Sequence, residues 1–170
     1  YELYKACYNP LMSVCMRYEK DDDSAKDLLN QGFLKILNNL KKYNQDVPFE
    51  PWIRRIMINV VIDNYRKNVK YKEQIWTEEN DKLEYLSNES VANHADEQFS
   101  AEDLERMIRS LPEASQKIFN LYAIDGYNHK EIAAMLNISD GTSKWHVSFA
   151  RKKLKAMIKE SLRTLSSMIV

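Results

Sequence analysis

The residues best suited to chemistry in this sequence are aromatic and cationic side chains, and they gather at two places. At the first, Phe49 and Trp52 stand among two prolines and are followed at once by Arg54 and Arg55. Aromatic rings stack on unpaired nucleic-acid bases, and guanidinium groups follow the phosphate backbone. The same spacing also suits a helix start at which large rings plug a core. The pattern by itself leaves both interpretations open.

The second place is the stretch 130–154, KEIAAMLNISDGTSKWHVSFARKKL. Ala133, Leu136 and Ile138 are spaced as in two short helices that are joined by a tight turn, a helix-turn-helix. Polar, aromatic and basic side chains then follow from the first turn of the second helix onward, as in a helix that reads bases in the major groove. The alternative is a plain amphipathic helix in a bundle. The coincidence of the turn with the basic stripe favours DNA binding.

The sequence offers no convergent polar site for catalysis. His94, His129 and His146 have no metal-ligand spacing to a Cys or a carboxylate, and we expect each at the surface or on DNA. A phosphate-cradling glycine loop and a nucleophile motif are both missing. Cys7 and Cys15 lack the CxxC spacing, which indicates buried, reduced thiols in a cytoplasmic protein. We therefore predict a protein that is not an enzyme and that binds no metal or cofactor.

The composition indicates which elements must position these residues. Hydrophobic residues make up 44% of the chain and charged residues 29%, with only three Gly, four Pro and many helix formers. The net charge is zero, but residues 68–99 carry three basic against eight acidic side chains. We predict an all-α protein with a three- or four-helix bundle at 1–68, a flexible acidic linker at 69–99 and a helix-turn-helix domain at 100–170. No apolar run approaches the ~18 residues of a membrane span, so no membrane insertion is expected.

Punctuating residues predict the helix boundaries. In the first domain, Asn9-Pro10 is expected to start a helix after a shorter piece at 2–8, Ser24 to cap the second helix, and Pro51 to begin the third after a loop at 41–50. Two buried stripes are expected from helical periodicity. They consist of Leu28, Leu29, Phe33, Ile36, Leu37 and Leu40, and of Ile53, Ile56, Met57, Val60 and Val61.

The second domain has sharper punctuation. Helices are expected at about 101–110 and from Leu111-Pro112 to Asp125-Gly126. Asn128 and Glu131 have the spacing of a capping box, in which each side chain satisfies a backbone N–H of the same helix start. Asn137 is expected in the left-handed conformation that ends this helix, and Ser139 is expected to cap a long final helix.

Three stretches taken together resemble bacterial sigma factors of the extracytoplasmic-function group, also called group IV. They are DLLNQGFLKILNNLKKY, PFEPWIRRIMINVVIDNYRK and the stretch 111–154. The resemblance covers nearly the whole chain and implies a region 2 domain and a region 4 domain. It implies a factor that binds core RNA polymerase, recognises the −10 and −35 promoter elements and promotes DNA melting for a specific regulon. The implied partners are promoter DNA (duplex at −35, single-stranded at −10), the β′ clamp helices and β flap of polymerase, and an anti-sigma factor.

The resemblance also assigns roles to individual residues. The helix from Asp27 to Leu40 resembles region 2.2, which docks on the clamp helices, and the loop 43–50 resembles the pocket for a flipped −10 base. Polymerase-binding residues are then Asp27, Leu28, Asn30, Gln31, Phe33 and Leu34. The −10 residues are Tyr43, Asn44, Phe49, Trp52, Arg54, Arg55, Asn59 and Asp63. The −35 residues are Ser139, Gly141, Thr142, Lys144, Trp145, His146, Ser148, Phe149, Arg151 and Lys152.

Two other functions compete with this one. The first is a stand-alone helix-turn-helix transcriptional regulator, whose N-terminal helices form a sensor or a dimerisation module. The second is a helical decoy that binds polymerase or an anti-sigma factor without opening a promoter. A sensor has no need of Trp52, Arg54 and Arg55 beside the loop 43–50, so the first domain discriminates between the candidates. The chain departs from many relatives at Asn30-Gln31, at Trp145 and at Phe149.

Overall fold

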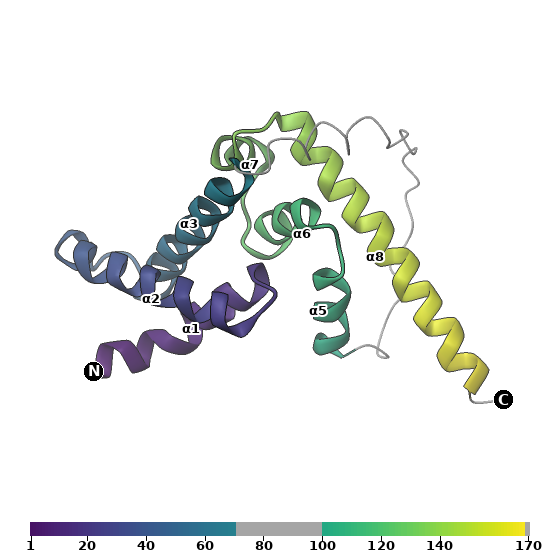
Figure 1. Cartoon of the computed structure of the whole chain (residues 1–170), viewed down its shortest axis with the longest axis horizontal. Helices are drawn as coiled ribbons and strands as arrows, with labels where there is room; N and C mark the ends of the chain where they lie inside the picture. Colours follow the sequence, from purple (N-terminus) through teal and green to yellow (C-terminus); the bar gives the residue numbers. More distant parts are fainter. Residues whose placement is uncertain (71–99, 169–170) are drawn as a thin grey trace.

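The computed structural model describes residues 1–70 and 100–168, and every regular element within them is a helix (Figure 1). The N-terminal domain consists of α1 (Glu2–Tyr18), α2 (Asp22–Asn39), the short 3-10 helix η1 (Leu40–Lys42) and α3 (Phe49–Lys70). The C-terminal domain consists of α5 (Ala101–Arg109), α6 (Glu113–Phe119), the π-helical turn η2 (Asn120–Ile124), α7 (His129–Leu136) and α8 (Asp140–Met168). The predicted all-α fold with two helical domains is confirmed. The expected linker falls almost entirely outside the described residues.

The predicted helix start at Asn9-Pro10 is wrong, because α1 runs through Pro10 without a break. A proline inside a helix removes one backbone hydrogen bond and costs about 3 kcal/mol. Tertiary packing offsets this cost here. Cys7 and Leu11, on either side of the proline, are both fully buried on the face that α1 turns to the other helices. Pro10 leaves the carbonyl of Ala6 without its helical donor, and Ala6 is exposed, so water can serve this carbonyl.

The starts of α2 and α3 also differ from the predictions. Asp21, three residues before Ser24, caps α2, and its side chain accepts a hydrogen bond of 2.8 Å from the Ser24 backbone N–H. The helix α3 begins at Phe49, two residues before Pro51. Pro51 therefore occupies the first turn, where the N–H groups have no partner within the helix.

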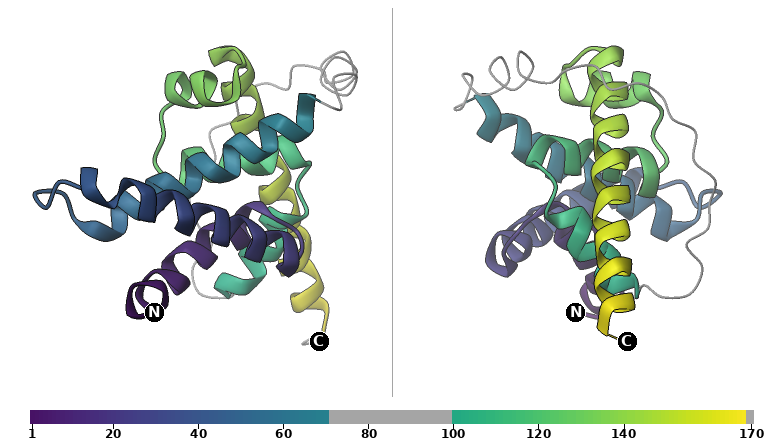
Figure 2. Two further views of the ribbon diagram at one scale, coloured as in Figure 1. Left: turned by 60° about the vertical axis from the view of Figure 1, so that its left-hand side comes forward. Right: turned by 90° about the vertical axis from the view of Figure 1, so that its right-hand side faces the viewer.

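The α2 and α3 helices cross closely at Gly32. A Cβ atom at this position would lie 2.3 Å from the sulfur of Met57, so the glycine permits the approach of the two helices. Most of both predicted stripes is buried in the core, but Leu37 and Leu40 are 42% and 38% exposed. The end of α2 and the following η1, which carry these two leucines, project beyond the rest of the N-terminal domain (Figure 2).

The helix boundaries within the C-terminal domain follow the predictions. Asn128 and Glu131 form the capping box of α7, Asn137 ends that helix with φ 56°, and Ser139 caps α8 through the Thr142 backbone N–H at 2.9 Å. Gly126 ends the preceding helical segment with φ 78°, a conformation that glycine adopts without strain. The sequence did not predict that the last turn of this segment is π-helical.

The two domains pack against each other. In Figure 1, α6 lies between the N-terminal helices and α8, and α7 lies beside α3. A single cluster of buried apolar residues joins Val60 and Val61 of α3 to Ile118 and Leu121 of the C-terminal domain. The helix α3 is consequently buried on two faces, since Ile58, which the predicted stripe did not include, is also only 4% exposed.

Candidate nucleic-acid interface

Three aromatic rings close the loop that precedes α3. The ring centroid of Tyr43 lies 5.3 Å from that of Phe49 and 4.8 Å from that of Trp52, and the Phe49 and Trp52 centroids are 5.7 Å apart. All three rings are half-buried, so each keeps part of its surface open to solvent. The structure thus brings together Tyr43, Phe49 and Trp52, which the sequence places within ten positions of one another. We call these three residues the aromatic cluster.

Short-range hydrogen bonds fix the loop beside the aromatic cluster. The Tyr43 hydroxyl donates to the backbone carbonyl of Val47, and the Asn44 side-chain oxygen accepts from the Asp46 N–H at 3.0 Å. The second bond is an Asx turn, which Asn favours by its short polar side chain. The Val47 side chain is 44% exposed. The loop therefore presents a preformed rim of exposed backbone and side chains next to the half-buried rings.

The polar −10 candidates lie along α3. The Arg54 guanidinium contacts Glu50 through Nε at 3.0 Å and a terminal nitrogen at 2.9 Å, so its charge is already partly compensated. Arg55, Asn59 and Asp63 are all exposed and recur every four residues, which places them in one row on the helix surface. Asp63 lies 3.5 Å from Lys35 of α2 and 3.9 Å from Arg66.

The outer face of α8 forms a second polar row. Gly141, Lys144, Ser148 and Arg151 are exposed at intervals of three and four residues, and Lys152 is exposed beside them. Thr142 is half-buried in the cap of Ser139, whose hydroxyl lies 2.8 Å from the Thr142 hydroxyl. Lys144 pairs with Asp140 one turn earlier at 2.6 Å.

Trp145 and Phe149 form one stacked unit on α8. Their ring centroids are 5.2 Å apart with an interplanar angle of 18°, and both side chains are half-buried. Arg151 lies over the ring of Tyr122, with its guanidinium carbon 5.4 Å from the ring centroid. The two aromatic residues therefore support each other by stacking. They present an apolar edge next to the exposed polar row.

The expectation that His146 lies at the surface or on DNA is wrong. Its side chain is 4% exposed, and its Nδ1 lies 2.9 Å from the Ser115 hydroxyl of α6. Burial lowers the pKa of His146 to about 4, so the imidazole is neutral at pH 7. The period of Ser143, Val147 and Ala150, all buried, could have placed His146 on the inner face of α8.

His129 also links the helices of the helix-turn-helix. Its Nδ1 lies 3.0 Å from the Ser143 hydroxyl of α8, and its ring stacks on Tyr122 with centroids 4.5 Å apart. His94 lies outside the described residues. Within 1–70 and 100–168, no group of three or more His, Cys, Asp or Glu side chains is arranged to hold a metal ion. Both cysteines are free and buried, and burial raises the pKa of the Cys15 thiol to about 12.

The surface of α2 carries the polymerase-binding candidates. Leu28 is only 2% exposed and belongs to the core, so it is not available to a partner in this structure. Phe33 is half-buried against Tyr4, with ring centroids 4.9 Å apart. Leu34 is 59% exposed and lies near the exposed Leu37 and Leu40, for which helical periodicity predicts burial. The remaining exposed candidates are Asp27, Asn30 and Gln31.

Comparison with known proteins gives the same two-domain division. Residues 3–71 match the family model "Sigma-70 region 2", and residues 101–154 match "Sigma-70, region 4". The chain is 27% identical over 156 residues to the ECF RNA polymerase sigma factor SigM of Bacillus subtilis, a match that covers 92% of this chain and 93% of SigM. It is 25% identical to the ECF RNA polymerase sigma factor SigE of Mycolicibacterium smegmatis, a match that covers 98% of this chain and 64% of SigE.

Among solved structures, the sigma factor RpoE, crystallised with the anti-sigma factor NepR from Bartonella quintana, has a similar fold. The TM-score is 0.55 at 15% identity, and the match covers 93% of this chain and 97% of RpoE. None of the described helices combines the length and the apolar character that crossing a bilayer requires. The two family models and the extracytoplasmic-function relatives together show that this chain belongs to the sigma-70 family, in its extracytoplasmic-function group, and is a transcription initiation factor.

Proposed function

We propose that this chain directs core RNA polymerase to promoters through three surfaces. The exposed face of α2 around Leu34 and Leu37 binds polymerase. The aromatic cluster and the row of Arg55, Asn59 and Asp63 hold the unstacked bases and backbone of the −10 element. The exposed row on α8 reads the −35 element as duplex in the major groove. The observation that carries this proposal is the aromatic cluster, which stands directly before an arginine-bearing helix in the same chain as a helix-turn-helix.

The proposed mechanism contains no bond chemistry by the factor itself. The C-terminal domain fixes the register on duplex DNA, and the aromatic cluster captures bases that have left the stack. Stacking on aromatic side chains is worth about 1–3 kcal/mol per base, which is the scale needed to bias melting of a few base pairs. Polymerase supplies catalysis. The factor acts where polymerase acts, in the cytoplasm, and its relatives support an anti-sigma factor as a further partner.

The departures on α8 bear on what the −35 surface reads. The stacked Trp145 and Phe149 place an apolar edge next to Ser148 and Lys144. An apolar edge in the major groove suits the methyl group of thymine, whereas lysine and arginine suit phosphates and guanine. His146 is buried and supports this surface from beneath, through Ser115 of α6 and through the edge-on contact of its ring with Trp145, whose centroid lies 4.8 Å away.

Reconstituted transcription tests the proposal. Purified chain is added to core polymerase with a library of promoter fragments, and run-off products are sequenced. We expect products that start downstream of a shared pair of elements only when the chain is present. A regulator that uses its helix-turn-helix alone would bind the duplex without directing core polymerase, and a decoy would reduce transcription everywhere. Either result would reject the proposal.

A further inference from the structure

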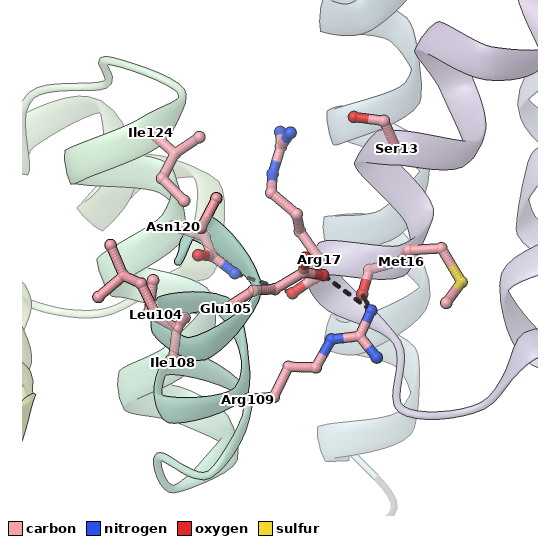
Figure 3. Close-up of a pocket in the computed structure, with 10 residues that line it drawn as sticks. Ser13, Met16, Arg17, Leu104, Glu105, Ile108, Arg109, Asn120 and Ile124 are labelled. Atoms are coloured by element: carbon pink, nitrogen blue, oxygen red, sulfur yellow. Dashed lines mark hydrogen bonds and ion pairs between the residues drawn. The ribbon is translucent and has the colours of Figure 1, made fainter. Parts of the chain in front are cut away.

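The end of α1 is capped by side chains from the other domain. The last carbonyl groups of a helix have no partner within it and must find donors elsewhere. In α1 the carbonyl of Met16 accepts from Arg109 at 2.8 Å, that of Arg17 accepts from Asn120 at 2.8 Å, and that of Tyr18 accepts from Lys117 at 2.7 Å (Figure 3 shows the first two). Three consecutive orphan carbonyls of one domain are thus satisfied by three side chains of the other.

A carboxylate reinforces this cap. Asp125, at the end of η2, accepts a hydrogen bond of 2.5 Å from the Tyr18 hydroxyl and pairs with Arg17 at 2.6 Å. The Asp125 side chain is only 6% exposed and that of Arg17 is 16% exposed, so the pair is largely removed from water. Removing one partner of a buried ion pair leaves the other without compensation and is strongly unfavourable. We call the Asp125 contacts and the three carbonyl contacts the interdomain latch.

An apolar surface lies beside the latch. Ile58, Ile62 and Tyr65 of α3 recur at intervals of four and three residues and are all buried. The ammonium group of Lys117, which belongs to the latch, lies 4.9 Å above the centroid of the Tyr65 ring. Ile58 lies at a cleft between the domains that Ile124 lines from the other side. Closure therefore buries a second face of α3 that a separated N-terminal domain would expose.

The interface is nevertheless imperfect. Arg17 Nε, Arg109 Nε, Gln116 Oε1 and Asn120 Oδ1 are buried and have no hydrogen-bond partner among the described residues. A cavity of about 540 Å³ lies at the same boundary, between the Arg17 end of α1 and helices α5 and η2 (Figure 3). Unsatisfied buried polar atoms and open volume are uncommon in a permanent core. Polar, loosely packed contacts are typical of interfaces between domains that move relative to each other.

Closure also brings acidic side chains to the proposed −10 surface. A cleft of about 400 Å³ has Arg54 and Arg55 on its α3 side, and Asp125 and Glu131 on the side of the C-terminal domain. DNA phosphates that approach these arginines from the cleft would meet the exposed Glu131 carboxylate, while the Asp125 carboxylate is largely buried in the latch. A like-charge encounter of this kind costs binding energy until the domains separate.

We propose that the free chain rests in this closed state, in which the interdomain latch holds the C-terminal domain over α3, and that the chain must open before both domains can grip a promoter. The part of the proposal that concerns promoter binding rests on the proposed function. The closure itself does not, because it is a property of the chain alone. If only the open chain binds DNA, the apparent Kd equals the Kd of the open chain divided by the fraction of molecules that are open. A chain that is closed for most of the time therefore binds DNA more weakly.

Fluorescence energy transfer in the full-length chain tests the closure. Dyes are attached at Lys26→Cys and Lys153→Cys, two exposed positions outside the proposed binding surfaces, while the native Cys7 and Cys15 are buried. Asp125→Ala and, from the other domain, Arg17→Ala open the latch, and the double variant tests whether the two act as one unit. Asp23→Ala is the matched control, because Asp23 is 95% exposed and its ion pair, with Lys26 of the same helix, lies away from the latch. Because Lys26→Cys would remove the partner of Asp23, this control and the parent chain that it is compared with carry the first dye at Asn38→Cys instead. Asn38 is also exposed.

We expect transfer to fall in Asp125→Ala and in Arg17→Ala, with no further fall in the double variant, while Asp23→Ala matches the parent chain. Binding of a labelled single-stranded −10 oligonucleotide should tighten by about three- to tenfold in the same variants. Unchanged transfer in both folded variants, checked by circular dichroism, would overturn the closed state. A fall in transfer without tighter DNA binding would retain the closure, but would overturn its inhibitory role. If no variant binds DNA or supports transcription, the proposed function fails while the transfer result still decides the closure.

Discussion

The ring of Trp52 leans on the ring of Tyr43, with centroids 4.8 Å apart and an interplanar angle of 46°. The Tyr43 hydroxyl in turn donates a hydrogen bond to the Val47 carbonyl across the loop. Trp52 is therefore both a wall of the loop and a half-exposed ring. The two interpretations of the sequence pattern are therefore compatible, because one ring packs in the loop and keeps part of its surface open to solvent.

Trp52→Ala separates these two roles. We expect open-complex yield to fall by about 5- to 150-fold, which corresponds to one lost stacking contact of about 1–3 kcal/mol. Binding to a duplex −35 fragment should not change, since α8 is a separate surface. Gel-shift and open-complex assays on the same preparation measure both quantities. Tyr8→Ala, which truncates an exposed ring of α1, is the control. Equal losses in the two assays would identify Trp52 as a purely structural residue.

Arg55 and Arg54 differ in how far their charge is compensated. Arg55 is exposed, whereas Arg54 is held by Glu50 at 2.9 Å. A neutralised phosphate of single-stranded DNA contributes about 0.7 to the slope of log affinity against log salt. We expect Arg55→Ala to reduce this slope by about that amount and Glu50→Gln to strengthen binding by freeing Arg54. A titration of single-stranded −10 DNA at several salt concentrations measures both changes. If Glu50→Gln weakened binding, the proposed role of Arg54 at the backbone would be wrong.

Two leucines of α2 differ in exposure, so we expect substitution of one to weaken polymerase binding and substitution of the other to lower stability. Leu37→Asp adds a charge to a side chain that is 42% exposed, so we expect the free energy of unfolding to be almost unchanged and the affinity for core polymerase to fall at least tenfold. Leu28→Ala removes a side chain that is 2% exposed and should lower the free energy of unfolding by about 2–5 kcal/mol. Urea unfolding and polymerase pull-down measure the two effects. A stable Leu28→Ala chain that loses polymerase binding would restore Leu28 as a contact residue.

The buried His146 makes stability depend on pH. Its folded-state pKa of about 4 lies below the value near 6.5 of an exposed histidine, so the unfolded chain binds the proton more readily. Stability from this group is therefore fully present above about pH 6.5 and is lost as the pH falls toward 4. Between pH 7 and pH 5 we expect a loss of about 1–2 kcal/mol in the free energy of unfolding. His146→Gln should remove this part of the profile, and equal slopes for both chains would contradict the assignment.

Local chemistry made much of the C-terminal domain predictable. The capping box of Asn128 and Glu131, the left-handed Asn137 and the Ser139 cap each depend on a few neighbouring residues, so the sequence contains all the information that they need. The helix start predicted at Pro10 failed for the opposite reason. The burial of Cys7 and Leu11 against other helices outweighs the local preference of proline, and this packing is not visible in the sequence.

In the candidate site too, features formed by residues close in sequence were predictable, and contacts between distant residues were not. The aromatic cluster was predictable because Tyr43, Phe49 and Trp52 are close in sequence and flank one turn. The interdomain latch was not predictable, because it joins the end of α1 to residues about a hundred positions later, such as Lys117. Buried polar residues of this kind follow no apolar period. The burial of His146 lies between these cases, since its inner position on α8 follows the helical period but was overridden by the expectation of a DNA contact.

Permanganate footprinting of promoter DNA with core polymerase tests the central claim most directly, because permanganate oxidises thymines that have left the stack. We predict reactive thymines in the −10 element when this chain is present, and far fewer with Trp52→Ala. Protection of the duplex −35 element from nuclease cleavage should be the same for the native chain and for Trp52→Ala. If promoter thymines stay unreactive with the native chain bound to polymerase, the claim that this chain opens promoter DNA is contradicted.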